Sequence, residues 1–416
     1  MEILRGMIGL LGFVFLAFLM SENKRKVRIK PIVFGLVLQI VIAVILSKVK
    51  IVIVFFEWIN RAVIALSHAT IAGTSFVFGY VGGGTVPFQL NAQGSAHLFS
   101  LAFMAMPMVI VIAAISGVLF YWRILPRVIH GLSWVLRRTL GIGGPLATGI
   151  SSNLFVGMCE SPFIIKPYLK KMTRNEIFTM MTCGMAGVAG TVMALYVTIL
   201  APVIPDVMVH VISAVIISVP AIIMISGIII PESESITLGD QLNLHKSLNV
   251  LDALTQGVKQ GVEVFVSIIA MLIVLIALVA FVNKLLELLP FINGHAISLK
   301  WLLGYAFMPF MWLMGVPWHE ALTAGQLMGE RMVLNELVSF QSLASLPKGA
   351  LDPRVSLMMM YAMCGFANFS GLGIMMAGYG TLAPNRRREI VKIGFKTMIA
   401  GTICTCMSAT VIGMIY

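Results

Sequence analysis

Residues 143–174 read GGPLATGISSNLFVGMCESPFIIKPYLKKMTR, and this stretch decides the topology of the chain. Its apolar part, residues 143–169, has the length of a membrane span, but Gly157 and Pro162 mark a helix break in its middle. Basic residues flank the break region on both sides, at Arg137, Arg138, Lys170, Lys171 and Arg174. Because basic residues remain on the cytoplasmic side of a membrane, both ends of the segment lie on that side. The stretch therefore predicts a re-entrant hairpin rather than a span.

The composition is that of a protein embedded in a membrane. Apolar residues make up 59 % of the 416 residues and charged residues 11 %, against about 45–50 % and about 25 % in globular proteins. So few charges cannot cover a water-facing surface. The net charge of +12 reflects 29 lysines and arginines, many of them in short clusters between apolar runs. Such clusters are a topology signal, so the composition excludes a soluble, disordered or nucleic-acid-binding protein.

Eight apolar runs have the length of about 20 residues that a membrane-spanning helix needs. They lie near residues 4–20, 31–47, 99–121, 175–199, 207–230, 262–283, 355–378 and 393–415. With all basic clusters in the cytoplasm, the topology closes only if 143–169 re-enters from the inside and a second broken region, 301–342, from the outside. Both termini then lie outside. The prediction is an all-α polytopic protein of the plasma (inner) membrane, with eight transmembrane helices and two opposed re-entrant hairpins.

Three connecting segments are predicted to lie outside the membrane core. Residues 51–68 and 122–139 are amphipathic and are expected along the outer and the inner membrane surface, respectively. Residues 231–260 are expected to form a long polar loop. The cysteines lie in apolar stretches without CxxC spacing and are expected to be free thiols, at positions Cys159, Cys183, Cys364, Cys404 and Cys406.

Two octets indicate an inverted internal repeat. Residues 183–190 read CGMAGVAG and residues 364–371 read CGFANFSG, with four identical positions and one exchange of Ala for Ser. Each octet follows a broken hairpin that contains a glutamate, Glu160 in the first copy and Glu336 in the second. Helices interrupted near the membrane midplane, in two copies of opposite orientation, are typical of secondary transporters. A channel is the alternative, although half-membrane hairpins with midplane acids favour alternating access.

Polar residues inside these segments are the candidates for a binding site, because a carboxylate in a bilayer costs about 2.5 kcal/mol or more unless it faces a cavity. Glu160, Glu336 and Asn368 are such residues. Alternatively, the two acids lie at water-exposed hairpin tips and Asn368 makes an interhelical hydrogen bond. The adjacent Glu330 and Arg331 are predicted to form a local ion pair.

Enzymatic activity has no support in the sequence. We find no nucleophile–base pair, no GxSxG, Walker or HExxH pattern, and no metal-ligand spacing among the seven histidines. The chain is therefore expected to be neither an enzyme nor an ATP-driven pump, and to carry no cofactor.

Several motifs, in order along nearly the whole chain, resemble those of the concentrative nucleoside transporters. They are Ser152-Asn-Leu-Phe-Val-Gly-Met-Cys-Glu-Ser-Pro162, Lys171-Met-Thr, Gly315-Val-Pro-Trp-His-Glu320, Asn335-Glu336-Leu-Val, Cys364-Gly-Phe-Ala-Asn-Phe-Ser370 and Leu382-Ala-Pro-Asn-Arg-Arg387. The resemblance implies a homotrimer that imports nucleosides together with Na⁺ or H⁺, by movement of a transport domain against a trimer-forming scaffold. The expected division is 1–121 for N-terminal, mainly scaffold helices, 122–260 for the first repeat, 261–300 for a scaffold helix and outer loop, and 301–416 for the second repeat.

The resemblance also implies the residues of the site. The first hairpin tip is expected to face the nucleobase, and Glu336 and Asn368 are expected to hold the ribose hydroxyls. The implied substrate residues are Gly157, Met158, Cys159, Glu160, Val192, Glu336, Asn368 and Gly371. The implied sodium ligands are Asn153 and Val156 in the first hairpin and Gly187 and Val188 in the broken fourth helix.

Three positions depart from the family pattern. Met158 replaces the usual Gln at the first hairpin tip and resembles the purine-preferring members. Gly187 lacks the hydroxyl that would bind sodium, so sodium and proton coupling both stay open, with Glu160 or Glu336 as the candidate proton carrier. Gly371 stands where the family often has a ribose-contacting Ser.

Overall fold

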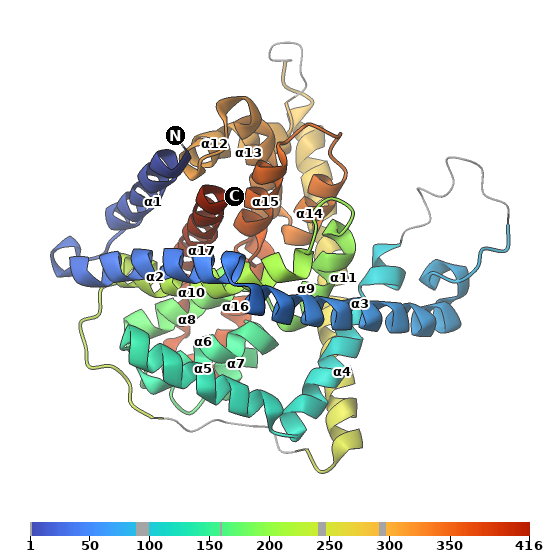
Figure 1. Cartoon of the computed structure of the whole chain (residues 1–416), viewed down its shortest axis with the longest axis horizontal. Helices are drawn as coiled ribbons and strands as arrows, with labels where there is room; N and C mark the ends of the chain where they lie inside the picture. Colours follow the sequence, from blue (N-terminus) through green and yellow to red (C-terminus); the bar gives the residue numbers. More distant parts are fainter. Residues whose placement is uncertain (1, 89–99, 159, 240–246, 291–296) are drawn as a thin grey trace.

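The computed structural model describes residues 2–88, 100–158, 160–239, 247–290 and 297–416, and every regular element in these ranges is helical (Figure 1). The helices are α1 Glu2–Leu19, α2 Ile29–Lys48, α3 Lys50–Phe78, α4 Met108–Tyr121, α5 Ile124–Leu140, α6 Gly144–Val156, α7 Glu160–Ile164, α8 Arg174–Ala186, α9 Gly190–Leu200, α10 Val207–Ile229, α11 Val250–Leu286, α12 Leu299–Met314, α13 Trp318–Val333, α14 Glu336–Ala344, α15 Pro353–Met363, α16 Phe369–Leu382 and α17 Arg387–Ile415. The all-α prediction is confirmed.

The first predicted hairpin is broken where the sequence places the break. Helix α6 ends at Val156 and α7 begins at Glu160. Gly157 between them has φ +100°, a backbone conformation that side chains with a Cβ rarely adopt. A Cβ at this position would also lie 2.8 Å from the Ala189 Cβ. Glycine is therefore required at this tip by both the backbone and the close approach of its neighbour.

Both octets of the repeat coincide with helix breaks. The predicted span 175–199 is two helices, α8 and α9, separated by an extended segment that begins at Gly187. The predicted span 355–378 is likewise divided into α15 and α16, and Asn368 begins α16 by accepting a hydrogen bond from the Gly371 N–H at 2.7 Å. The interruption expected at the octets is confirmed, because glycine and a capping Asn end the helical hydrogen bonds there and leave half-helices.

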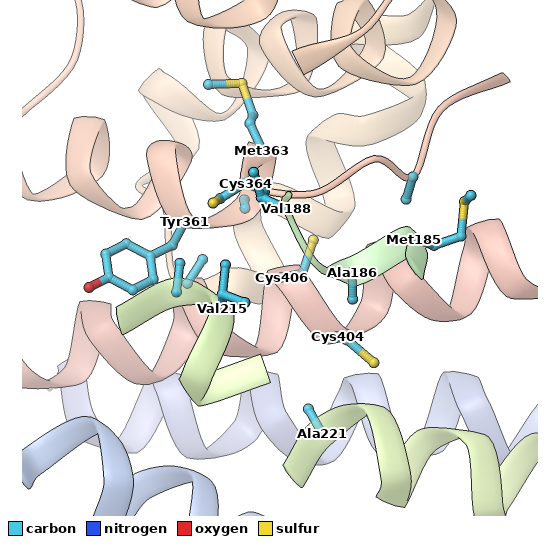
Figure 2. Close-up of a cluster of buried hydrophobic side chains, with 14 of the residues drawn as sticks. Met185, Ala186, Val188, Val215, Ala221, Tyr361, Met363, Cys364, Cys404 and Cys406 are labelled. Atoms are coloured by element: carbon cyan, nitrogen blue, oxygen red, sulfur yellow. The ribbon is translucent and has the colours of Figure 1, made fainter. Parts of the chain in front are cut away.

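The two breaks lie against each other in the centre of the protein. A Cβ on Gly365 would lie 2.9 Å from the Met185 carbonyl oxygen and 3.0 Å from that of Ala186. Figure 2 shows Val188 of the first break next to Cys364 of the second, with Cys404 and Cys406 of α17 beneath them. The four described cysteines are buried free thiols, as predicted, whereas Cys159 lies outside the described residues.

The second hairpin differs from its prediction. Residues 301–342 form most of three helices, because α12 and α13 fold back on each other through a bend of 120°. Gly315, with φ +109°, and the following Pro317 make this bend. The break that carries the acid is a second one, between α13 and α14, directly before Glu336. The acid therefore lies at the turn between α13 and α14, and α12 packs on α13.

Two connecting segments are also corrected. The stretch 51–68 is part of the 29-residue helix α3, which is long and apolar enough to cross a membrane. The polar loop predicted over 231–260 ends at Asn249, because the Asn249 side chain accepts a hydrogen bond from the Asp252 N–H at 2.8 Å and caps α11. In contrast, the amphipathic stretch 122–139 is a single helix, α5, as expected.

Helices α4 and α11 form a closely packed pair at the right of Figure 1. Small residues permit the close approach, since a Cβ on Gly257 would lie 2.5 Å from the Ala113 carbonyl oxygen. Helices α1 and α2 pack instead on α17 and α10. The division of the chain into scaffold and transport domains remains a prediction.

Basic segments predicted to be cytoplasmic meet at one end of the molecule. Glu22 pairs with Arg174 at 2.9 Å and with Lys396 at 2.8 Å, and Arg174 also pairs with Glu389 at 3.5 Å. Arg386 donates a hydrogen bond to the Met172 carbonyl oxygen. Both termini lie together elsewhere, where Gly6 packs against Met414, as their predicted placement on one side of the membrane requires.

Replacing Glu22 by glutamine is expected to destabilise the protein slightly at neutral pH. Partial burial alone would raise the pKa of Glu22, but hydrogen bonds from Arg174 and Lys396 outweigh burial and hold the pKa below 4.5. The carboxylate therefore stabilises the fold above its unfolded-state pKa, and this stability is lost as the pH falls through the lowered pKa. Because the pairs are partly exposed, the difference should be below about 1 kcal/mol.

Thermal unfolding in detergent at pH values from 7 to 3 measures this effect. Wild type and Glu22→Gln should differ at pH 7 and converge at the acid end. Glu287→Gln, which removes the exposed partner of Lys284, is the matched control and should change little. A constant difference at every pH would contradict the assignment.

Candidate functional site

A cavity of about 510 Å³ lies between the two hairpins, the second halves of the broken helices and the α4–α11 pair. From the repeats, α9, α14, α16 and the first hairpin tip contribute to its wall. From the α4–α11 pair, polar side chains face it at Ser116, Gln256, Gln260 and Glu263. The volume suits a small polar organic molecule, and the mixture of apolar wall and few polar groups is typical of ligand sites.

The structure brings the implied substrate residues together in this cavity. Those that line it are Gly157, Met158, Glu160, Val192, Glu336, Asn368 and Gly371. Cys159, the remaining one, lies outside the described residues. The two acids come from opposite repeats, Glu160 from the start of α7 and Glu336 from the start of α14.

Glu336 is the centre of the polar cluster in the cavity. Its side chain is 3 % exposed, and its two carboxylate oxygens accept separate hydrogen bonds. Tyr196 Oη donates to Oε1 at 3.0 Å, and Asn368 Nδ2 donates to Oε2 at 3.0 Å. The ring of Tyr196 packs edge-on against Phe340 at 4.8 Å between centroids, which fixes the phenol. A carboxylate held in this way retains lone pairs that can accept from hydroxyl groups of a ligand.

Helix caps set the positions of these groups. The Asn335 side chain accepts from the Val338 N–H at 3.1 Å and begins α14, so that Glu336 is the first residue of that helix. Asn368 plays the same part for α16 with its Oδ1, which leaves its Nδ2 for Glu336. The caps hold the acid at a helix N-terminus, where the helix dipole favours negative charge.

The implied sodium ligands lie beside this cavity. Asn153 is buried, and its Nδ2 donates to the Cys183 carbonyl oxygen at 3.1 Å while its Oδ1 accepts from Ser161 Oγ at 3.4 Å. A Cβ on Gly187 would lie 2.6 Å from Asn153 Nδ2, so these two residues are neighbours. Val156 ends α6 and lines the cavity, and Val188 is buried in the first break.

Sequence reasoning missed two residues of this region and misplaced an ion pair. Tyr196, which bonds to Glu336, carries no signal in its apolar surroundings. Arg331 is fully buried, and its Nη2 donates to the Gly365 carbonyl oxygen at 3.1 Å. The predicted Glu330–Arg331 pair is wrong, because Glu330 pairs with Lys300 at 3.4 Å and adjacent residues of a helix do not face each other.

Family models match the chain along most of its length. Residues 8–81 and 210–413 match the N-terminal and C-terminal models of the Na⁺-dependent nucleoside transporters, and residues 102–203 match a nucleoside recognition model. The uncharacterized transporter YutK of Bacillus subtilis is 33 % identical over 419 residues, which cover 100 % of both chains. The chain belongs to the concentrative nucleoside transporter family.

Other similarities agree with this assignment. The structure of the concentrative nucleoside transporter CNTnw in an inward-facing, substrate-bound state matches with a TM-score of 0.90 at 26 % identity, covering 100 % of this chain and 99 % of that one. Rat solute carrier family 28 member 3 is 30 % identical over 98 % of this chain, which spans 58 % of the longer rat protein. The resemblance drawn from the motifs is confirmed, and the chain is a nucleoside transporter of a multi-pass membrane family and not an enzyme.

Proposed function

We propose that this transporter imports nucleosides, with purine nucleosides favoured, by symport with sodium across the inner membrane. The main support is the hydrogen-bonded Glu336–Asn368–Tyr196 cluster, of which Glu336 and Asn368 line a cavity between two pseudo-symmetric, broken repeats. Such a site can be exposed to alternate sides by movement of one part of the protein against another.

The ribose is proposed to bind at Glu336 and Asn368. A carboxylate accepts hydrogen bonds from two vicinal hydroxyls, and each such charge-assisted bond contributes about 1.5–3 kcal/mol. The Gly371 N–H already donates to Asn368 Oδ1, and glycine has no side-chain hydroxyl. The helix cap, rather than a serine, therefore orients this part of the site.

The nucleobase is proposed to lie against the first hairpin tip. Met158 lines the cavity there and offers a flexible, polarizable thioether but no strong hydrogen-bonding group. This surface suits the face of a bicyclic purine better than the polar edge of a pyrimidine. A broad or pyrimidine specificity is the alternative.

Sodium is proposed as the coupling ion, with protons as the alternative. The matched family models describe Na⁺-dependent transporters, and the Asn153 side-chain amide lies next to the Cys183 carbonyl oxygen in the last turn of α8. Gly187 removes one hydroxyl ligand, and water can supply an oxygen in its place. Glu160 and Glu336 are the acids that would carry a proton.

The working assembly is proposed to be a homotrimer in the lipid bilayer, without a cofactor or nucleic-acid partner. Many apolar side chains of α11 are uncovered in the single chain, among them Ile273 at 64 % and Phe281 at 62 % exposed. This helix and α4 would form the scaffold against which the two repeats move, and their apolar faces are available to lipid and partner subunits.

Uptake of labelled inosine into proteoliposomes under separate gradients tests the coupling. An inward sodium gradient at equal pH should drive accumulation, whereas a pH gradient without sodium should not. Accumulation that follows the pH gradient and ignores sodium would make protons the coupling ion. The absence of any gradient-driven nucleoside accumulation would contradict symport itself.

Adding a side-chain hydroxyl at position 187 of the proposed sodium site is expected to lower the sodium concentration that transport needs. Gly187→Ser should reach half-maximal uptake at a lower sodium concentration than Gly187→Ala. The alanine variant is the matched control, because either Cβ must displace the Asn153 amide from 2.6 Å and only serine adds an oxygen. Equal sodium requirements in the two variants would remove residue 187 from the ion site.

A further inference from the structure

Arg331 has the largest side chain among the fully buried residues of the described chain. Its Nε and Nη2 both donate to the Gly365 carbonyl oxygen, at 3.3 and 3.1 Å, and its Nη1 donates to Thr402 Oγ1 at 3.4 Å. The guanidinium thus connects α13, the second break and α17. Arg331 is not among the described residues that line the cavity, so it lies behind the cavity wall.

The position of Arg331 relates it to both ribose-binding groups. On the chain, Arg331 precedes Glu336 by five residues. Gly365 lies in the break between α15 and α16, three residues before Asn368. The free carbonyls at the end of α15 carry the negative end of a helix dipole, which a cation stabilises.

In the first repeat, a neutral side chain donates to a carbonyl oxygen of the octet. There the hairpin residue Asn153 donates to the Cys183 carbonyl oxygen, and Cys183 is the first residue of its octet. In the second repeat the hairpin residue Arg331 donates to Gly365, the second residue of its octet. Each repeat therefore ties its hairpin to its octet through a side-chain donor, which is an amide in the first repeat and a guanidinium in the second.

We propose that Arg331 is a positioning residue for ribose recognition, a tethered cation that fixes the second break so that Asn368 and Glu336 face the ligand together. The proposal rests on the proposed ribose-binding role of these two residues. A buried ion of this kind is a poor source of stability, since a well-packed apolar side chain of similar volume often serves as well. Its forked contact with one carbonyl instead specifies the geometry of the break.

Two variants separate geometry from packing. Arg331→Met keeps an apolar chain of comparable length without the charge, and Arg331→Lys keeps the charge without the fork. Arg354→Met is the matched control, because Arg354 also donates to a backbone carbonyl, that of Gly413 at 2.8 Å, at the opposite end of α15. The first readout is amide hydrogen exchange of residues 364–371 in the purified protein, which needs no ligand.

The second readout compares inosine with 2′,3′-dideoxyinosine as inhibitors of labelled inosine uptake. In Arg331→Met, amide exchange of residues 364–371 should rise, while exchange of α2 stays unchanged. The affinity for inosine should fall about tenfold or more, which corresponds to about 1.4 kcal/mol. The dideoxy compound, which lacks the hydroxyls, should change less than about twofold. Arg331→Lys should be intermediate in both readouts, and Arg354→Met should match wild type.

Unchanged exchange in Arg331→Met, or an equal loss for both compounds, would overturn the proposal. If Arg331→Met does not fold, Arg331→Lys carries the same comparison, and wild-type behaviour of that variant in both readouts would also overturn it. If the wild-type protein takes up no nucleoside, the proposed function fails, whereas the exchange measurement still decides whether Arg331 fixes the break.

Discussion

Nucleoside uptake is expected to fall by about a hundredfold or more when Glu336 is replaced by glutamine. The carboxylate is proposed to accept from two ribose hydroxyls, and it accepts from Tyr196 Oη and Asn368 Nδ2 as well, both at 3.0 Å. A glutamine amide has one oxygen only, so its NH₂ group would face one of these two donors. The variant therefore loses the charge and one acceptor oxygen in a buried site, and Tyr196 Oη must accept rather than donate if it faces the NH₂ group.

Initial rates of labelled inosine uptake in proteoliposomes measure this loss. Glu330→Gln is the matched control, because Glu330 belongs to the preceding helix and pairs with Lys300. It should transport like wild type. Near-normal uptake by Glu336→Gln, at equal amounts of folded protein, would remove Glu336 from the ribose site.

Met158→Gln is expected to shift the preference from purine towards pyrimidine nucleosides by about tenfold. A glutamine amide can donate to and accept from the edge of uracil, and the loss of such pairing costs about 1–3 kcal/mol. Met158 at the first hairpin tip offers only its thioether. The wild-type protein should therefore bind inosine more tightly than uridine, and the variant should narrow or reverse this difference.

Competition of unlabelled inosine and uridine against labelled inosine measures the preference. Met271→Gln is the control, because Met271 lines the same cavity from α11 and not from the hairpin. It should leave the ratio of the two inhibition constants unchanged. Uridine that competes with wild-type uptake as well as inosine does would contradict the purine assignment.

Much of the fold was predictable because a bilayer restricts the chain to few arrangements. Apolar length, basic clusters and the break at Gly157 predict the helices and the first hairpin, since irregular backbone inside a membrane must line a cavity or be buried in protein. The octets point to the two helix breaks, which interrupt the apolar runs 175–199 and 355–378. The second hairpin was predicted less well, because Gly315 and Pro317 add a bend that apolar length cannot distinguish from the hairpin turn.

The site was predictable where a polar residue interrupts an apolar run. Glu160, Glu336 and Asn368 stand out for this reason, and all three line the cavity. Tyr196 does not stand out, because an aromatic residue is ordinary in an apolar helix and its hydroxyl partner is 140 residues away in sequence. Arg331 was predicted to pair with its neighbour Glu330. Its partner in the structure is the Gly365 backbone carbonyl, which is available only because the chain breaks between α15 and α16.

One nucleoside is proposed to bind per chain at the Glu336–Asn368 cluster. Equilibrium binding of labelled inosine to the purified protein in detergent with sodium tests it directly, without any transport step. We expect saturable binding with one site per chain in wild type and Glu330→Gln, and loss of this binding in Glu336→Gln. Equal binding of inosine by wild type and Glu336→Gln would contradict it.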